Sequence, residues 1–128
     1  MTSIIKRFDV GADAAKAWGM ISDTGGVTRL TNLITECRLD GDQRHCTMAD
    51  GSHVTEDIIS VDRENMRLVY TVTDGPMPLD FHCSTVQVLE RGDAASVIWT
   101  VDIKPDALAE HMAPMMDMVA ANMRDALA

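Results

Sequence analysis

Two ionisable side chains interrupt segments that otherwise place apolar residues on one face. Glu56 stands between Val54 and Ile58 at the spacing of two that is typical of a β-strand, and His82 lies in a later alternating segment. A carboxylate that points into an apolar interior is costly unless it is paired or protonated. Such a group is a candidate anchor for a ligand, or a candidate general acid or base with a raised pKa.

Glu56 also has a purely structural interpretation. Arg44 falls on the same inward set as Cys46 and Met48, so its guanidinium could pair with the Glu56 carboxylate inside the protein. The sequence leaves three roles open for this carboxylate: ligand anchor, catalyst and member of a structural ion pair.

His82 has two interpretations. It shares its alternation with Ser84, which favours an inward imidazole, although Phe81 makes the opposite face apolar too. If it faces Glu56, the two form an acid/base pair suited to aldol-type cyclisation or dehydration, with Ser84 and Tyr70 donating hydrogen bonds to an enolate oxygen. Otherwise His82 is a hydrogen-bonded histidine at the rim of a cavity.

Other chemistries are not indicated. The pairs His45-Cys46 and His82-Cys83 each point to opposite faces of a strand, and in a meander they lie roughly 14 Å apart at about 4.8 Å per strand. That separation is too large for zinc, whose ligands lie about 2.3 Å from the ion, so no metal site is expected. The chain has no nucleophile elbow, phosphate loop or dinucleotide fingerprint, and we expect no cofactor.

The first third of the chain predicts a strand followed by two helices. Ser3 to Val10 is β-rich, and Asp13 is a candidate N-cap for a helix whose apolar residues recur at helical spacing from Ala14 to Ile21. Thr24-Gly25-Gly26 should stop this helix, and residues Val27 to Leu33 fit a short second one.

The middle of the chain predicts an antiparallel meander. From Ile34 onward apolar residues alternate with polar ones, and Gly-containing turns separate the segments. The alternation changes parity between Val54 and Val61, so we expect a bulge near Ile58-Ile59. The predicted inner face consists of Cys37, Leu39, Cys46, Met48, Met66, Leu68, Tyr70, Val72, Val97, Trp99, Val101 and Ile103.

The C-terminal segment predicts a long helix. It follows Pro105, begins at Asp106 and continues for about 22 residues, or about 33 Å, enough to cross a whole sheet. An apolar stripe runs along it, and most of this stripe should be core. Five of the ten methionines lie here, and because thioether side chains adapt to irregular partners, a lined pocket is the alternative. The stripe consists of Leu108, Met112, Met115, Val119, Met123 and Leu127.

Length and composition predict one acidic domain spanning residues 1–128. With 11 Lys and Arg against 20 Asp and Glu, the net charge of -9 disfavours nucleic acid and anionic membranes as partners. No stretch approaches the roughly 20 apolar residues of a membrane span, and the N-terminus lacks the apolar core of a signal peptide. The three cysteines, an odd number without motif spacing, suit reduced thiols, so we expect a cytoplasmic location.

Short motifs occur in a fixed order over nearly the whole chain. They are Trp18 with Asp23; Arg44, Asp50-Gly51 and Glu56; Asp62, Tyr70-Thr71-Val72 and Gly75-Pro76-Met77-Pro78; and Ser84, Val86, Val88 and Trp99. In this order they resemble the START-like superfamily, also called SRPBCC, and within it the bacterial polyketide cyclase/dehydrase group.

The resemblance implies an α+β helix-grip fold. In that fold a curved antiparallel sheet of about seven strands wraps around a long C-terminal helix, with two short helices after the first strand, and a small apolar or amphipathic molecule is held between sheet and helix. Carried over by position, the residues expected to line the cavity are Cys37, Cys46, Met48, Glu56, Tyr70, Val72, His82, Ser84, Met115, Val119 and Asn122.

Three functions follow as hypotheses. The first is a binding or carrier protein for a small hydrophobic molecule, with Glu56, His82 and Ser84 as its few polar contacts. The second is a cyclase or dehydratase that uses Glu56 and His82 as acid and base. The third is an interaction module with a filled core, whose methionine-rich helix contacts a partner or a second copy in a homodimer.

Overall fold

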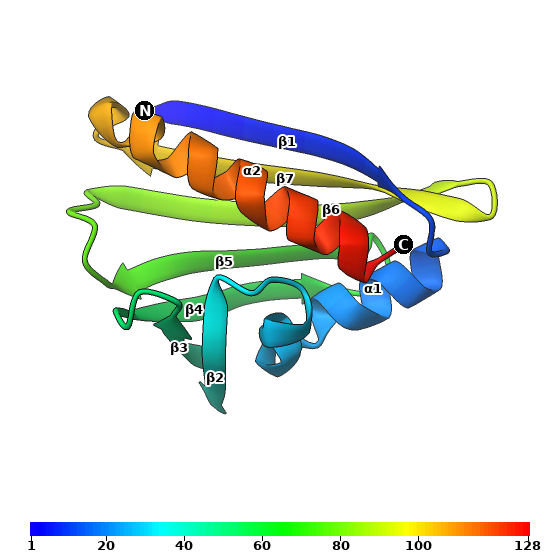
Figure 1. Cartoon of the computed structure of the whole chain (residues 1–128), viewed down its shortest axis with the longest axis horizontal. Coiled ribbons are helices and arrows are strands. Elements are labelled where there is room, and N and C mark those ends of the chain that lie inside the picture. The colour runs from blue at the N-terminus through cyan, green and yellow to red at the C-terminus, as the bar shows by residue number, and fades with distance from the viewer.

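The sheet is a single antiparallel layer of seven strands, described for residues 1–128 in a computed structural model. The spatial order is β1-β7-β6-β5-β4-β3-β2, so every consecutive pair from β2 to β7 is adjacent and β1 closes against β7. Figure 1 shows β1 and β2 at opposite edges of the layer. The strands are β1 (Thr2–Val10), β2 (Ile34–Asp40), β3 (Gln43–Met48), β4 (His53–Asp62), β5 (Arg67–Asp74), β6 (Phe81–Arg91) and β7 (Ala94–Lys104).

The helices lie on one face of this sheet. The long α2 crosses the face over β7 and β6, and α1 with η1 lies at the end toward which the C-terminus of α2 points (Figure 1). The amide of Ala12 donates to the carbonyl of Leu127 at 2.8 Å, which ties the end of α2 to the start of α1. The helices are α1 (Ala14–Ser22), η1 (Thr24–Arg29), η2 (Asp106–Leu108) and α2 (Ala109–Ala126). None of them combines the length and the apolar character required to span a bilayer.

The predicted start of the first helix is confirmed. The carboxylate of Asp13 accepts a hydrogen bond from the amide of Lys16 at 2.8 Å, as an N-cap does. The apolar positions that follow are buried in the main core cluster, with Ala17 and Ile21 among them.

The second helix begins earlier than predicted. It is a 3₁₀ helix over Thr24–Arg29 that contains both Gly25 and Gly26, and the side chains of Asp23 and Arg29 lie directly against Gly26. A Cβ on Gly26 would lie 2.5 Å from the Asp23 carboxylate, which pairs with Arg29 at 2.6 Å across this turn. The glycines therefore belong to the 3₁₀ helix and let this ion pair close over it.

The bulge predicted from the change of parity in β4 is confirmed. Ile58 is paired with Tyr70 and Ser60 with Val69, so Ile59 has no partner in β5 and is 58% exposed. The bulge keeps Glu56 and Ile58 on the inner face although the strand continues with opposite parity.

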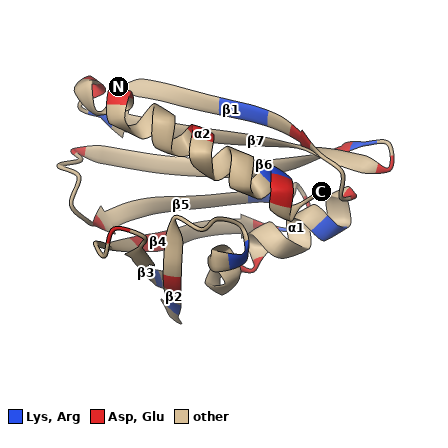
Figure 2. Ribbon diagram, viewed as in Figure 1, with Lys and Arg blue, Asp and Glu red and all other residues tan.

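The inner face follows the predicted alternation except at its edge. Val97, Trp99, Val101 and Ile103 of β7 are buried, and the charged residues of β5, β6 and β7 lie near the ends of these strands (Figure 2). Leu39 is the exception, because it is 44% exposed and the prediction that it faces the core was wrong. It lies on edge strand β2, where Gly25 of η1 lies against its side chain.

The C-terminal helix is shorter than predicted, and its apolar stripe divides in two. The α-helix has 18 residues, preceded by the 3₁₀ turn η2. Met112, Met116 and Ala120 are buried in the core, whereas Met115 and Val119 on the adjacent stripe are only half-buried. The half-buried stripe indicates that part of α2 faces a space that the core does not fill.

The core side of α2 yields a stability prediction. Met116 is fully buried and Met118, two residues away, is 56% exposed. Met116→Ala should lower the free energy of unfolding by about 2–4 kcal/mol, because it removes a buried side chain and leaves a cavity. Met118→Ala should change it by less than about 0.5 kcal/mol. Urea denaturation of both variants tests this, and equal losses would contradict the assignment of the two faces.

Candidate functional site

A cavity lies between the sheet and α2, and it has two chambers. The inner chamber has a volume of about 120 Å³ and the outer chamber about 260 Å³. The two chambers share part of their walls and are therefore adjacent. The shared residues are Ile34, Met48, Glu56, Tyr70, Trp99 and Met115.

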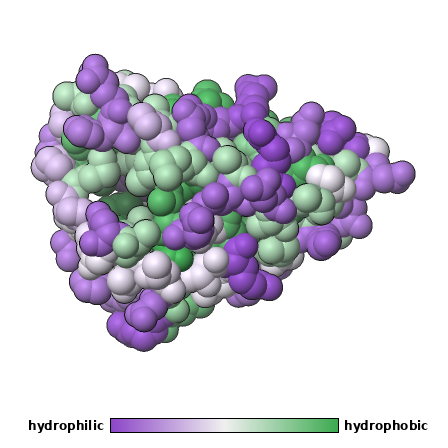
Figure 3. Space-filling view, viewed as in Figure 1, coloured by the Kyte–Doolittle hydropathy of each residue, from purple (hydrophilic) through white to green (hydrophobic).

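The outer chamber opens to solvent between two loops and the first half of α2. Asp50 and Ser52 of the β3–β4 turn and Pro76 and Met77 of the β5–β6 loop line it, opposite Met112 of α2. Figure 3 shows a hollow with an apolar floor on the side where Figure 1 places these loops.

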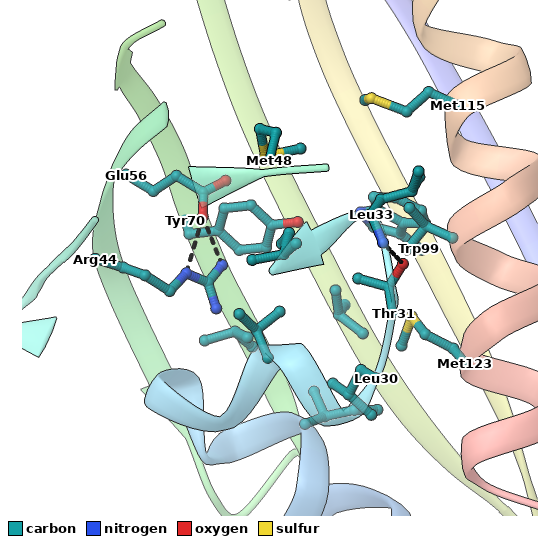
Figure 4. A pocket seen from close by; sticks show the side chains of 16 residues that line it. Leu30, Thr31, Leu33, Arg44, Met48, Glu56, Tyr70, Trp99, Met115 and Met123 are labelled. Atoms are coloured by element: carbon teal, nitrogen blue, oxygen red, sulfur yellow. Dashed lines mark hydrogen bonds and ion pairs between the residues drawn. The ribbon is translucent and has the colours of Figure 1, made fainter. Parts of the chain in front are cut away.

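The inner chamber is almost wholly apolar. Hydrophobic residues make up 13 of its 16 lining positions, and α1, η1 and the segment after η1 close its far end with Ile21, Val27, Leu30 and Leu33. Figure 4 shows Met115 and Met123 projecting from α2 on one side of this chamber, with Arg44 and Glu56 on the opposite side. The chamber therefore offers its occupant mainly dispersion contacts and the exclusion of water.

One buried ion pair stands in the wall between the chambers. Arg44 donates from both Nε and Nη2 to Oε1 of Glu56, each at 2.8 Å, and from Nη1 to the carbonyl of Thr24 at 3.1 Å. The side chain of Arg44 is 4% exposed and that of Glu56 is 12% exposed. The structural ion pair considered from the sequence is therefore present, and it links β3, β4 and η1 (Figure 4).

Glu56 keeps one oxygen free for the cavity. Both bonds from Arg44 end on Oε1, and no buried side-chain oxygen or nitrogen in the structure lacks a hydrogen-bond partner, so the unpartnered Oε2 has accessible surface. Glu56 borders both chambers, which places this surface in the cavity. Burial raises the pKa of Glu56, and the charge of Arg44 opposes the rise.

Tyr70 stands beside this pair. The guanidinium carbon of Arg44 lies 4.9 Å from the centre of the Tyr70 ring, a cation–π distance. Burial raises the pKa of Tyr70 to about 12, so its hydroxyl stays protonated. Figure 4 shows this hydroxyl pointing away from Arg44, toward Trp99.

The protonation of His82 follows from its backbone contact. The amide of Val72 donates to Nδ1 of His82 at 3.0 Å, so in the neutral ring the proton sits on Nε2. Nε2 has no partner within the protein, so it has accessible surface, and His82 lines the outer chamber. Burial lowers the pKa of His82 to about 4, so the ring is neutral at physiological pH.

Most of the residues expected at the site meet at the cavity. Eight of them line one or both chambers, namely Cys46, Met48, Glu56, Tyr70, Val72, His82, Met115 and Val119.

Three of the expected residues lie elsewhere. Ser84 is fully buried behind the wall and accepts a hydrogen bond from Nε1 of Trp99 at 2.8 Å. Asn122 accepts from the Thr31 hydroxyl at 2.7 Å and so joins α2 to the segment after η1. Cys37 lies near the β2 edge, where its thiol donates to the Thr24 carbonyl at 3.8 Å. None of the three lines either chamber.

Sequence reasoning missed the far end of the inner chamber. Leu30, Leu33 and Ile34 follow η1, where alternation and helical spacing both fail, so their apolar character was the only signal. Trp99 was predicted to face inward but not to line the site, although a buried Trp needs a partner for its N–H and Ser84 supplies it. No three His, Cys, Asp or Glu side chains come together in an arrangement that could hold a metal ion.

A comparison with models of known protein families shows which family this chain belongs to. The model of the family described as "Polyketide cyclase / dehydrase and lipid transport" matches residues 1–128. The chain belongs to this family. A comparison with curated proteins finds no match.

Solved structures of similar shape confirm the START-like helix-grip fold. The protein XoxI from Bacillus cereus has a TM-score of 0.87 at 19% identity and covers 99% of this chain and 93% of its own. A protein from Thermobifida fusca has a TM-score of 0.83 at 26% identity, with 99% and 91% covered. A START superfamily protein from Mycobacterium smegmatis has a TM-score of 0.83 at 12% identity, with 98% and 96% covered.

The buried ion pair yields a prediction from a double-mutant cycle. Arg44→Met should lower the free energy of unfolding by about 3–5 kcal/mol, because it leaves the Glu56 carboxylate without its partner. The double variant Arg44→Met/Glu56→Leu should recover much of that loss, because two apolar side chains of similar volume replace both charges. Urea denaturation gives all the free energies, and strictly additive losses in the double variant would contradict a coupled pair.

His82 yields a prediction for acid stability. Its folded-state pKa of about 4 lies below the ordinary 6.5, so the unfolded chain binds this proton first as the pH falls. The stability contributed by neutral His82 is complete above pH 6.5 and is lost between about pH 6.5 and 4, by about 2–3 kcal/mol.

The matched variants are His82→Gln, which removes the titrating ring, and His53→Gln, which changes an exposed histidine. Urea denaturation at pH values across this window gives the free energy of unfolding of each protein. As the pH falls, this free energy should fall less for His82→Gln than for wild type, and His53→Gln should follow wild type. Parallel curves for all three proteins would show that His82 titrates normally.

Proposed function

We propose that this protein binds a small hydrophobic or amphipathic molecule in the cavity between the sheet and α2. The observation that carries the proposal is the adjacent pair of chambers, of which the inner is almost wholly apolar and the outer is lined by the β3–β4 turn and the β5–β6 loop. Ligand sites in proteins are concave, mostly apolar, and equipped with a few polar groups that fix orientation. The family description names lipid transport among its activities, in agreement with such a role.

The composition of the wall supports an adaptable binding site. Five methionines border the chambers, and flexible thioether side chains can fill or vacate space as a ligand enters. They are Met48, Met77, Met112, Met115 and Met123. A core packed with branched aliphatic side chains would not adjust in this way.

Binding is better supported than acid–base catalysis by Glu56 and His82. A general base needs a free lone pair, and the only ring nitrogen of neutral His82 that carries one already accepts from the Val72 amide. Glu56 Oε1 is likewise held by Arg44, which leaves Oε2 as the one oxygen that can meet a ligand. These contacts suit fixed hydrogen-bonding roles.

The interaction module with a filled core is the least supported of the three hypotheses. Its premise is that the protein's own side chains occupy the space under α2, whereas Met115 and Val119 border an open chamber. For location, we propose the cytoplasm, and the three free thiols of Cys37, Cys46 and Cys83 support it.

The proposal predicts the effect of filling the cavity. Nile red, a neutral apolar dye, should bind and fluoresce in the wild-type protein. Met115→Trp places a large ring where the two chambers meet and should weaken dye binding about tenfold or more, because the dye and the indole compete for one volume. Met118→Trp adds the same ring on the exposed face of α2 and should bind like wild type.

Fluorescence titration of the three proteins gives the dissociation constants. Absence of dye binding in the wild-type protein, or equal binding by both variants, would overturn the proposed site.

A further inference from the structure

The charged groups that face the outer chamber are all acidic. Asp50 stands at its mouth, where hydrogen bonds from Ser52 lower the pKa of its carboxyl, and Glu56 stands in its wall. Arg44 borders only the inner chamber, and its Nη1 is held by the Thr24 carbonyl. A ligand in the outer chamber therefore meets carboxylates and no cation.

Glu56 and His82 line this chamber from strands on either side of Val72. Glu56 on β4 is the direct partner of Val72 on β5, and the Val72 amide bonds to the ring of His82 on β6. The three residues form a row across three strands, so the backbones of Glu56 and His82 lie about 10 Å apart, two strand spacings. Glu56, Val72 and His82 all line the outer chamber.

The two groups differ in what they can accept and donate. Glu56 Oε2 can accept a hydrogen bond and has none within the protein, whereas His82 Nε2–H can donate one and has no acceptor. A group that binds both must itself donate on one side and accept on the other. A hydroxyl or a primary carboxamide does this, whereas a carboxylate offers no proton and an ether offers none either.

We propose that the outer chamber selects the head group of a neutral, hydroxyl- or carboxamide-bearing apolar molecule, which donates to Glu56 Oε2 and accepts from His82 Nε2–H. This inference rests on the proposed function and specifies its ligand class. A fatty carboxylate is rejected because its charge would lie against Glu56 with no free cation nearby. An alkylammonium satisfies Glu56 but leaves the His82 donor without an acceptor.

The remaining space accommodates the rest of such a molecule. The inner chamber lies beyond Met48 and Met115, which line both chambers, and its wall is apolar except for Thr31 and the Arg44–Glu56 pair. A hydrocarbon chain that points inward from the head group would bury its surface there. The polar end then stays near the mouth, where the ligand enters.

The test is a displacement series at neutral pH with Nile red as the reporter. Decanol, decanoic acid and decyl methyl ether carry the same chain and differ only in the head group. Decanol should displace the dye at a concentration about tenfold or more below that needed for the acid or the ether, because only decanol donates to the carboxylate and is uncharged. Decanamide should behave like decanol, and decylamine should fall behind both.

The outcomes separate this inference from the proposed function. If Nile red binds and all the probes displace it equally, or the acid does so best, the head-group assignment is wrong and the binding site stands. If Nile red does not bind, both fail.

Glu56→Gln adds a test of the named contact. Its amide still accepts from Arg44 and presents N–H to the cavity, so the advantage of decanol over decanoic acid should shrink at least severalfold. Glu36→Gln removes a carboxylate from the exposed edge strand and should leave the advantage unchanged. An unchanged advantage in a Glu56→Gln protein whose circular dichroism matches wild type would overturn the role of Glu56. The comparison of decanol with its methyl ether in the wild-type protein tests the donor requirement without any substitution.

Discussion

One helix cannot cover a sheet of seven strands, and this mismatch of width determines the rest of the structure. Six strand spacings of about 4.8 Å make a layer about 29 Å wide, whereas a helix with its side chains is about 10 Å across. The long α2 therefore covers the half of the face nearest β1 and β7 (Figure 1). Over β3, β4 and β5 the inner face would be open to water, and the chain closes it only partly with α1, η1 and the loops. The cavity is the space that remains.

The Arg44–Glu56 pair makes a polar group tolerable in that space and also limits its chemistry. A lone carboxylate in an apolar wall would be costly, so the guanidinium, itself held by the Thr24 carbonyl and the Tyr70 ring, offsets its charge. Nε and Nη2 of Arg44 both contact Oε1 of Glu56. The guanidinium therefore offsets the charge of the carboxylate while Oε2 stays free to accept a hydrogen bond. In His82 the amide of Val72 donates to Nδ1, which fixes the proton of the neutral ring on Nε2. In each of the two side chains, one polar atom is bonded within the protein and the other, Oε2 of Glu56 or Nε2 of His82, has no partner there.

The sequence predicts the fold well and the site less completely, for physical reasons. Alternation in β4 locates the bulge at Ile58-Ile59, because an extra residue in one strand shifts the parity of every side chain that follows it. Parity also places Glu56, Tyr70 and His82 inside, since each lies on a strand with neighbours on both sides. It fails at Leu39 because an edge strand can lie beyond the elements that cover the face. The family resemblance predicts that Ser84 and Asn122 line the cavity, but their side chains instead bond to Trp99 and Thr31. No local sequence pattern shows which partner a hydroxyl or an amide will find.

The divided stripe of α2 shows how core and cavity share one element. Met116 and Ala120 pack into the core, while Met115 and Val119, on the adjacent stripe, border the inner chamber. Because the two stripes belong to one rigid helix, the core side fixes the position of the cavity wall, and the thioethers on the other side supply the local adjustment. Under the proposed function, rotamer changes would accommodate the ligand without displacing α2. Glu56 and His82 on the sheet are held in place, Glu56 by Arg44 and His82 by the amide of Val72. Under the proposed function, shape tolerance would come from the helix and chemical selectivity from the sheet, and such a site would discriminate by head group more than by the shape of the chain.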